Sequence, residues 1–258
     1  MTRDDLRDLG RFCVWLALAT VPFYFLGSSA LSALTRAALP ASALMVVVPA
    51  VAALAATARS GRSRGLGRSL RLRRGPLLSW LVAVAAMPPI VFAASGGGFE
   101  NPGWPILGLS VVFLVGAVAE ELGWTGYVLP RLRRVVGELR AGAAIGLVWA
   151  AWHLIPWAQT GYNAGAIAGL CAFSIAFRLV LVRISTAADD SVWPAVVGHA
   201  VYNLAWAVSP NAGRDYDPWT AAILTTAVAI GLCLIGRGSP RTPPPHAWGR
   251  RSNPGTLR

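Results

Sequence analysis

The sequence predicts an all-α polytopic membrane protein, a bundle of about eight transmembrane helices. Of its 258 residues, 55% are hydrophobic and 13% are charged, whereas a soluble domain carries about 25% charged residues. The mean hydropathy is +0.54. Apolar runs of about 20 residues, the length that crosses the hydrocarbon core of a bilayer, recur along the chain.

Eight apolar runs are candidates for these helices. In chain order they are residues 11–34, 38–58, 76–95, 105–127, 141–157, 163–182, 193–209 and 218–236. The first run follows an N-terminus with both acidic and basic residues, and no small-residue cleavage site stands out after it. We therefore interpret it as a retained span rather than a signal peptide. The fifth, sixth and seventh runs are short or interrupted by glycine.

The positive charge alternates between loops. All 23 basic residues are arginine, against 11 acidic residues. Seven arginines lie in residues 59–74, four in 131–140 and five after Ile235, while the loops 96–104 and 158–162 contain none. This alternation obeys the positive-inside rule and predicts that both termini are cytoplasmic. Charge confined to one membrane face predicts anionic membrane lipids as a partner and argues against nucleic acid.

The same pattern divides the chain into four parts. Residues 1–104 hold the first three helices and the basic cytoplasmic loop 59–74, residues 105–210 form a core, and residues 211–236 supply the last helix. The tail 237–258, rich in proline and arginine, is predicted to be disordered, with His246 solvated in it. The three cysteines lie in apolar runs without a CxxC pair, so we expect neither a disulfide framework nor a thiolate zinc site.

Five ionisable residues remain inside the predicted spans: Glu120, Glu121, His153, Arg178 and His199. Arg178 lies near a predicted cytoplasmic end, where its long side chain can reach the interface. The other four have no such route to water. Because a charged or polar group in hydrocarbon costs a few kcal/mol, such residues usually face the bundle interior and carry function.

The spacing of these residues predicts one shared pocket. Trp149 and His153 are four residues apart, as are His199 and Asn203, so each pair shares a helix face, with Trp149 expected to stack one turn below His153. At about 1.5 Å per residue, Glu120, His153, His199 and Asn203 can lie in one layer of the membrane. We therefore expect a polar chamber built from three helices.

Two hydrolytic chemistries suit such a chamber. In one, Glu120 is a general base and His153 orients the attacking water, while His199 and Asn203 donate hydrogen bonds to an oxyanion. In the other, Glu120, His153 and His199 bind a zinc ion that activates water. The spacing leaves both open, and the absence of an HExxH motif leads us to favour the metal-free one. A structural role and a proton relay in a transporter are weaker alternatives.

Three segments carry a family resemblance. In order, "EELGWTGYVLPRL", "WAAWHLIPW" and "GHAVYNLAW" resemble the three motifs of the CPBP family of intramembrane endopeptidases, also called the Abi family, which includes CAAX proteases and bacteriocin-processing proteins. Those motifs read EExxxR, an aromatic residue with His four later, and His with Asn four later. The resemblance covers about residues 105–210. It implies an eight-helix bundle, with a bacterial plasma membrane as the expected location.

The resemblance also implies roles for individual residues. Glu120 and His153 would activate water, and His199 and Asn203 would form the oxyanion hole, with Glu121 and Trp149 in support. One position departs from the motif, because Thr125 stands where EExxxR has its arginine. That arginine would pair with Glu121, so Glu121 here must be protonated, solvated or paired with another basic group. Weakened catalysis is a consequence that this departure leaves open.

The expected function is therefore hydrolysis of a peptide bond in a membrane-presented peptide or protein. The main alternative is a catalytically weak or inactive member that acts as a membrane scaffold or bacteriocin self-immunity factor. A cofactor is not required in the preferred mechanism, and zinc is the one that the alternative mechanism would use. Prenylated proteins are the substrates of one branch of the family, and nothing in the sequence selects them.

Overall fold

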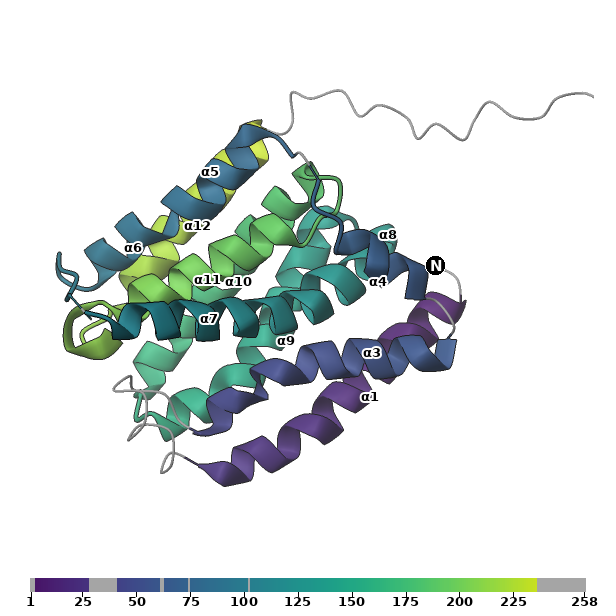
Figure 1. Ribbon diagram of the computed structural model, residues 1–258, viewed down its shortest axis with the longest axis horizontal. Coiled ribbons are helices and arrows are strands. Elements are labelled where there is room, and N and C mark those ends of the chain that lie inside the picture. Colours follow the sequence, from purple (N-terminus) through teal and green to yellow (C-terminus); the bar gives the residue numbers. More distant parts are fainter. Residues whose placement is uncertain (1–2, 28–40, 61–62, 74, 102, 236–258) are drawn as a thin grey trace, which may run out of the picture.

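A computed structural model gives the described part of the chain as an assembly of helices (Figure 1). The described residues are 3–27, 41–60, 63–73, 75–101 and 103–235, and no strand occurs within these ranges. The predicted all-α class is confirmed. The tail 237–258 and His246 lie outside the described residues, so the disorder expected for the tail stays a prediction.

The elements follow the apolar runs closely. The N-terminal elements are α1 (Arg3–Leu26), the 3₁₀ helix η1 (Ala41–Val47), α3 (Val48–Ser60), α4 (Ser63–Ser69), α5 (Leu77–Ala85) and α6 (Met87–Ala94). The C-terminal elements are α7 (Pro105–Glu121), the π-helix η2 (Leu122–Val128), α8 (Leu129–Val136), α9 (Glu138–Gln159), α10 (Ala164–Ala187), α11 (Trp193–Ala207), the 3₁₀ helix η3 (Pro210–Gly213) and α12 (Pro218–Ile235).

Within the described residues, 6 helical stretches are long and apolar enough to cross a membrane. They are Asp4–Leu26, Leu77–Ala94, Pro105–Val136, Glu138–Gln159, Ala164–Ala187 and Pro218–Ile235. The other two predicted spans are helical but shorter, namely Ser42–Ala58 and the 15-residue α11. The first helix begins at Arg3 rather than at residue 11. A polytopic membrane protein is thus confirmed, and eight is an approximate count of its crossings.

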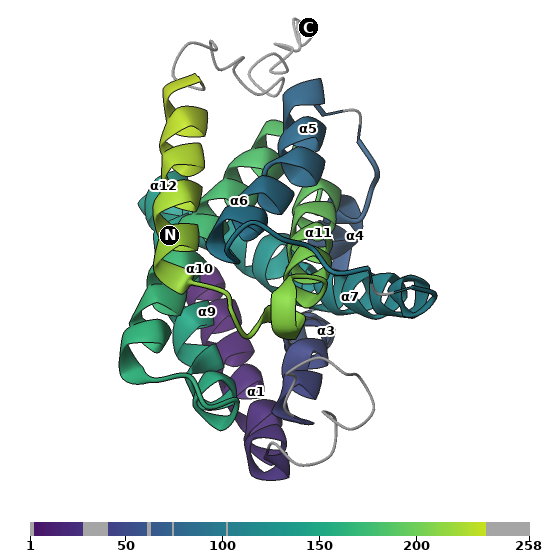
Figure 2. The same ribbon diagram turned by 90° about the vertical axis from the view of Figure 1, so that its left-hand side faces the viewer.

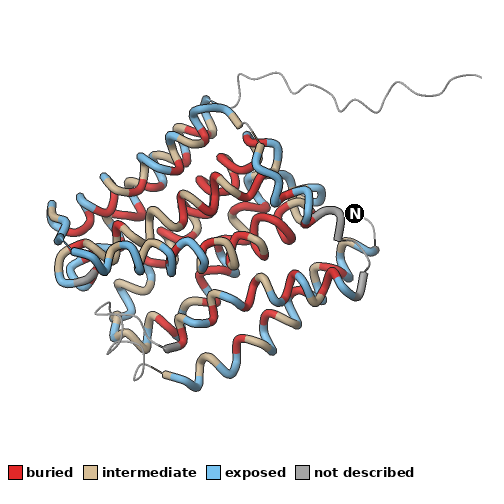
Figure 3. The backbone as a smooth tube through the Cα atoms, in the orientation of Figure 1, coloured by how far each residue is buried: buried red, intermediate tan, exposed pale blue. Residues whose placement is uncertain are grey.

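The helices pack around α10 and α11. Helix α10 lies against both α9 and α12, α1 runs along α3, and α11 contacts α5, α6, α7 and α10 (Figures 1 and 2). Buried residues gather on the sides that face this centre, and the outward sides of the outer helices are exposed (Figure 3). Apolar side chains on those outward sides, such as Leu18, Val51 and Leu81, suit contact with lipid tails.

Two glycines bring α9 and α10 close together. A Cβ atom on Gly146 would lie 2.8 Å from the Cα of Ile175, and one on Gly142 would lie 3.0 Å from Cδ2 of Leu179. Glycines four residues apart form a groove on one helix face that admits a neighbouring backbone. This contact brings α10 against the helix that carries Trp149 and His153.

A π-helix follows the two glutamates. In η2 the backbone widens, so that the N–H of Leu129 donates to the carbonyl of Trp124 five residues earlier. Within η2, Gly123 lies against α3, where a Cβ atom would come within 2.5 Å of the Cβ of Pro49. Wide turns of this kind are rare and often occur at functional sites. Here the wide turn begins directly after Glu121, at the end of α7.

Arginine-rich segments meet at one end of the bundle. Arg133 of α8 pairs with Asp190 at 2.5 Å, Arg134 pairs with Asp5 of α1 at 2.7 Å, and Arg73 lies 3.6 Å from Asp189. These pairs join the segments around residues 59–74 and 131–140 to α1 and to the connection between α10 and α11. Arg73, Arg133 and Arg134, which are distant along the sequence, are therefore gathered at one end of the described bundle.

Candidate active site

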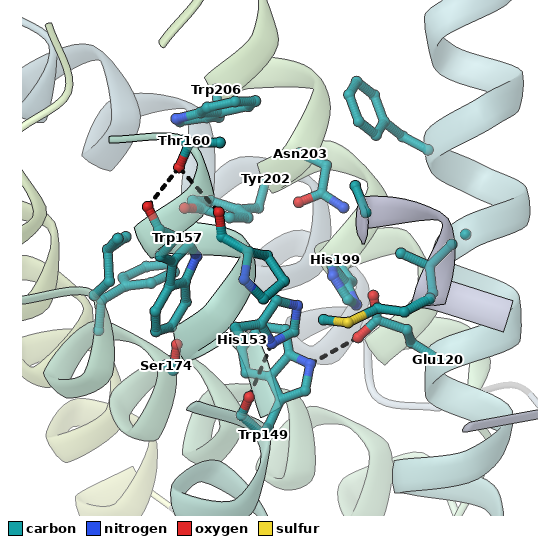
Figure 4. Close-up of a pocket in the computed structure, with 18 of the residues that line it drawn as sticks. Glu120, Trp149, His153, Trp157, Thr160, Ser174, His199, Tyr202, Asn203 and Trp206 are labelled. Carbon is teal, nitrogen blue, oxygen red and sulfur yellow. Dashed lines mark hydrogen bonds between the residues drawn. The ribbon is translucent and has the colours of Figure 1, made fainter. Parts of the chain in front are cut away.

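A cavity of about 240 Å³ opens among α7, α9, α10, α11 and η1. Its lining includes the four predicted site residues: Glu120 from α7, His153 from α9, and His199 and Asn203 from α11 (Figure 4). Most of the remaining wall is apolar or aromatic, and includes Met45, Phe113, Trp157, Phe173, Tyr202 and Trp206. The three helices thus bring a carboxylate, two imidazoles and an amide to one pocket.

The Glu120 side chain is held by Trp149. It is 2% exposed, and its Oε2 accepts a 2.7 Å hydrogen bond from Nε1 of Trp149 (Figure 4). One carboxylate oxygen is thereby fixed between α7 and α9. This leaves Oε1 as the oxygen available to a bound water or substrate proton.

Glu121 is not in the cavity wall but is buried beside it in an ion pair. Its oxygens lie 2.9 Å and 2.7 Å from Nη1 of Arg178, and both side chains are fully buried. Thr125 donates to Oε2 of Glu121 at 2.5 Å. The prediction that Arg178 reaches the membrane interface is wrong, because Glu121 offers a buried partner on α7 and both groups are then neutralised inside the bundle.

His199 connects this ion pair to the cavity. Its Nδ1 lies 2.9 Å from Oε1 of Glu121, the geometry of a hydrogen bond donated to the carboxylate. The ring is 2% exposed and touches Trp149 edge-on, with ring centroids 5.5 Å apart. Asn203 lies one turn further along α11 and lines the same cavity, as the four-residue spacing predicts.

His153 is oriented by its own helix. Its Nδ1 lies 2.8 Å from the carbonyl oxygen of Trp149. Because a carbonyl oxygen only accepts, Nδ1 carries the proton and Nε2 is left as an acceptor. The predicted stacking on Trp149 is wrong: the two rings meet edge-on at 79°, and the ring that stacks on His153 is Trp157, at 22° and 5.4 Å.

A proline and a distant tyrosine fix the end of α9. Pro156 has no N–H, so the carbonyl of Trp152 has no partner within the helix. The hydroxyl of Tyr24 donates to that carbonyl at 2.8 Å, and Nε1 of Trp152 donates to Thr20 at 2.8 Å. Helix α1 thereby holds the turn that carries His153. Sequence reasoning missed this contact, for which an interior proline was the available signal.

The side-chain amide of Gln159 links this end of α9 to two other elements. Gln159 donates to the carbonyl of Tyr24 at 2.8 Å, and Ser42 of η1 donates to Oε1 of Gln159 at 2.6 Å. These bonds connect α1, α9 and η1 at the cavity rim. Residues 41–47 are consequently part of the site's surroundings, although the predicted core begins at residue 105.

Metal ligation is not prearranged in the described residues. Within that part of the chain, no group of three or more His, Cys, Asp and Glu side chains is placed to hold a metal ion. One nitrogen of each imidazole is engaged, His153 with a backbone carbonyl and His199 with Glu121. Each ring keeps its other nitrogen free, which suits either chemistry. The metal-free reaction stays a prediction, to be tested directly.

The arrangement can be compared with known families. The family model for the type II CAAX prenyl endopeptidase, Rce1-like, matches residues 102–205. The resemblance to the CAAX proteases is confirmed. The matched Rce1-like segment contains the four predicted site residues that line the cavity. It also contains Glu121 with its partners Thr125, Arg178 and His199. Elements α1, η1, α3 and α12 lie outside it. No curated protein matches the chain. The Rce1-like match supports a protease, hence a hydrolase, embedded in the membrane.

Proposed function

We propose that the chain is an intramembrane endopeptidase that hydrolyses a peptide bond with water activated by Glu120 and His153. The observation that carries the proposal is the convergence of Glu120, His153, His199 and Asn203 on one cavity walled by apolar and aromatic side chains. Four polar groups from three helices are costly to bury for packing alone.

The two acceptor atoms that the bonds described above leave open, Oε1 of Glu120 and Nε2 of His153, suggest how water is activated. A water between α7 and α9 donates one hydrogen to Oε1 of Glu120 and the other to Nε2 of His153. Glu120 removes the first proton as the water oxygen attacks the scissile carbonyl carbon, and His153 orients the water through the second. Glu120 then returns its proton to the departing amine, so that one water is consumed and two chain ends are released.

The other wall of the cavity suits the oxyanion. The amide nitrogen of Asn203 and Nε2 of His199 donate to the oxygen that becomes negative in the tetrahedral intermediate. For His199 to donate from both nitrogens, the ring must be an imidazolium. Glu121, which also pairs with Arg178, accepts from Nδ1 of that imidazolium, and the carboxylate of Glu120 supplies the second negative charge of the site.

The substrate class follows from the cavity's position. Its lining includes Met45 and Val46 of η1 and Val112 and Gly116 of α7, elements whose outer surfaces are apolar. We propose that an extended segment of a peptide or protein enters from the membrane and is cut within the cavity or close to it. The protein would reside in a bacterial plasma membrane, with anionic lipid at the basic end and both termini cytoplasmic.

The test is cleavage by purified protein in proteoliposomes. A panel of quenched fluorescent peptides with apolar segments is offered in ¹⁸O-enriched water, and products are identified by mass spectrometry. We expect a new carboxyl terminus that carries one ¹⁸O atom. The variants Glu120→Gln, His153→Ala and Asn203→Ala should each lose cleavage, whereas Glu138→Gln, which alters a carboxylate outside the cavity, should retain it.

The alternatives predict other outcomes. A scaffold or self-immunity factor would cut none of the peptides, and Glu120→Gln would still protect cells that produce the matching toxin. A transporter would show proton-driven solute flux in the same liposomes. Either result, with cleavage absent from folded wild-type protein, would overturn the proposed function.

A further inference from the structure

Arg178 is a buried cation that sequence reasoning left without a task. It lies in α10, is 0% exposed, and places Nη1 within 2.9 Å of both oxygens of Glu121. Its guanidinium carbon also lies 4.7 Å from the centre of the Trp149 ring, within the range of a cation–π contact. Neither Glu121 nor Arg178 belongs to the cavity lining, although each touches residues that do.

The two contacts of Arg178 lead to cavity residues on three different helices. Through Glu121 it reaches His199, whose Nδ1 bonds to Oε1 of the same carboxylate. Through Trp149 it reaches Glu120, which accepts from the indole N–H, and His153, which bonds to the Trp149 carbonyl. Arg178 therefore contacts two residues, Glu121 and Trp149, that are hydrogen-bonded to the groups of the proposed mechanism. These groups are the base Glu120, the water-orienting His153 and the oxyanion donor His199.

The packing admits an arginine at this position at some cost. Gly146 of α9 leaves room, since a Cβ atom there would lie 3.3 Å from the Cβ of Arg178. Nε and Nη2 of Arg178 are buried and have no hydrogen-bond partner among the described residues. A buried ion pair with unsatisfied donors is a poor source of stability, and apolar replacements are often neutral or stabilising. Its presence is better explained by what it positions.

We propose that Arg178 is the positioning residue of the site, holding Glu121 and Trp149 and, through them, the cavity residues of α7, α9 and α11. It supplies from α10 the positive charge that position 125 of η2 would carry in the EExxxR motif, where this chain has Thr125. This inference rests on the proposed function for its kinetic consequence, and on the structure alone for its effect on His199.

Kinetics distinguish positioning from folding. Arg178→Leu should lower kcat by about 10- to 100-fold, the range for residues that orient a reacting group, with a smaller change in KM. The double variant Glu121→Leu/Arg178→Leu removes both charges and should fold as stably as wild type, yet remain as slow as Arg178→Leu. The double variant Thr125→Arg/Arg178→Leu returns a cation to Glu121 from η2 and should recover activity.

The matched control lies on the same helix. Arg183 pairs with Glu138 at 2.9 Å, five residues further along α10 and away from the cavity. Arg183→Leu should leave kcat within about threefold of wild type, as expected for a partly exposed side chain. Full activity of folded Arg178→Leu, or of folded Glu121→Leu/Arg178→Leu, would overturn the inference.

A second measurement needs no substrate. In ¹⁵N-histidine-labelled protein in detergent, the side-chain nitrogen signals of His199, assigned with His199→Gln, should shift in Arg178→Leu. They should return toward wild type in Thr125→Arg/Arg178→Leu and stay unmoved in Arg183→Leu. Unmoved His199 signals in Arg178→Leu would overturn the inference even if cleavage is observed. A shift seen in a protein that cuts no peptide would sustain the link to His199 and refute only the protease.

Discussion

The indole N–H of Trp149 on α9 donates to Oε2 of Glu120 on α7 at 2.7 Å. The contact orients the carboxylate of a residue that lines the cavity, and it occupies Oε2 while leaving Oε1 for the proposed water. Because the residues are 29 positions apart and both are buried, the bond also joins two helices at the centre of the site.

Removing this donor should slow catalysis without unfolding the protein. Trp149→Phe keeps a ring for Arg178 and His153 to contact but deletes the N–H. Loss of a hydrogen bond to a charged group is worth about 1.5–3 kcal/mol, so kcat should fall by about tenfold to a hundredfold. Trp219→Phe is the control, since it deletes an indole bond to the carbonyl of Gly165, outside the cavity lining, and should leave kcat unchanged. Equal rates in Trp149→Phe and wild type would contradict this role.

The close approach of α9 and α10 depends on Gly146. Gly146→Ala places a Cβ atom 2.8 Å from the Cα of Ile175, so the helices must separate. Overpacking of this kind costs about 1–3 kcal/mol, and Tm in detergent should fall. Gly231→Ala, whose Cβ atom meets nothing within 4 Å, is the matched control and should leave Tm unchanged or higher. An unchanged Tm in Gly146→Ala would show that this contact is not tight.

Asp217 caps the start of α12 and should make stability depend on pH. Its carboxylate accepts from the hydroxyl and N–H of Thr220 and from the N–H of Trp219, and the Thr220 hydroxyl bond is the main reason that the pKa of Asp217 is lowered. A lowered folded-state pKa contributes stability above the unfolded value, about 3.9, that is lost as pH falls through the folded value.

Asp217→Ala should therefore lower Tm at pH 7 by an amount that shrinks in acid. The expected cost of the lost cap at pH 7 is about 1 kcal/mol. Asp215→Ala removes a neighbouring carboxylate that bonds to Asn211 instead of to α12, and serves as the control. A difference in Tm between Asp217→Ala and wild type that grows toward low pH would contradict the sign.

Metal dependence is predicted to be absent. Prolonged treatment with a strong chelator should leave the cleavage rate of the reconstituted protein unchanged, and elemental analysis of active protein should find zinc well below one atom per chain. Stoichiometric zinc, with activity lost on chelation and restored by zinc alone, would favour the alternative in which Glu120, His153 and His199 are ligands.

Much of this architecture is predictable from the sequence because a bilayer imposes simple rules. Apolar length identifies the helices, and the cost of buried polar groups singles out Glu120, His153 and His199. The four-residue spacing that joins His199 to Asn203 is a property of a single helix. Such local rules are sufficient to place the four residues on the faces that line the cavity.

The supporting contacts are not predictable in this way, because they join residues that are distant along the chain. Arg178 is 57 positions from Glu121, and Tyr24 is 128 positions from Trp152. No periodicity indicates which helix packs against which. The lone arginine in an apolar run was a usable signal, since its cost demands a partner, but its position near a predicted helix end suggested an interfacial role. The π-helix after Glu121 has no comparable signature in the sequence.

The most direct test of the account is the cleavage rate of Glu120→Gln beside Glu138→Gln, each purified, reconstituted and matched to wild type in Tm. Loss of a general base costs about 10²- to 10⁴-fold, so Glu120→Gln should cut the peptide identified for wild type at least about a hundredfold more slowly, while Glu138→Gln keeps the wild-type rate. Cleavage by folded Glu120→Gln at the wild-type rate would contradict the proposal that this carboxylate activates the attacking water.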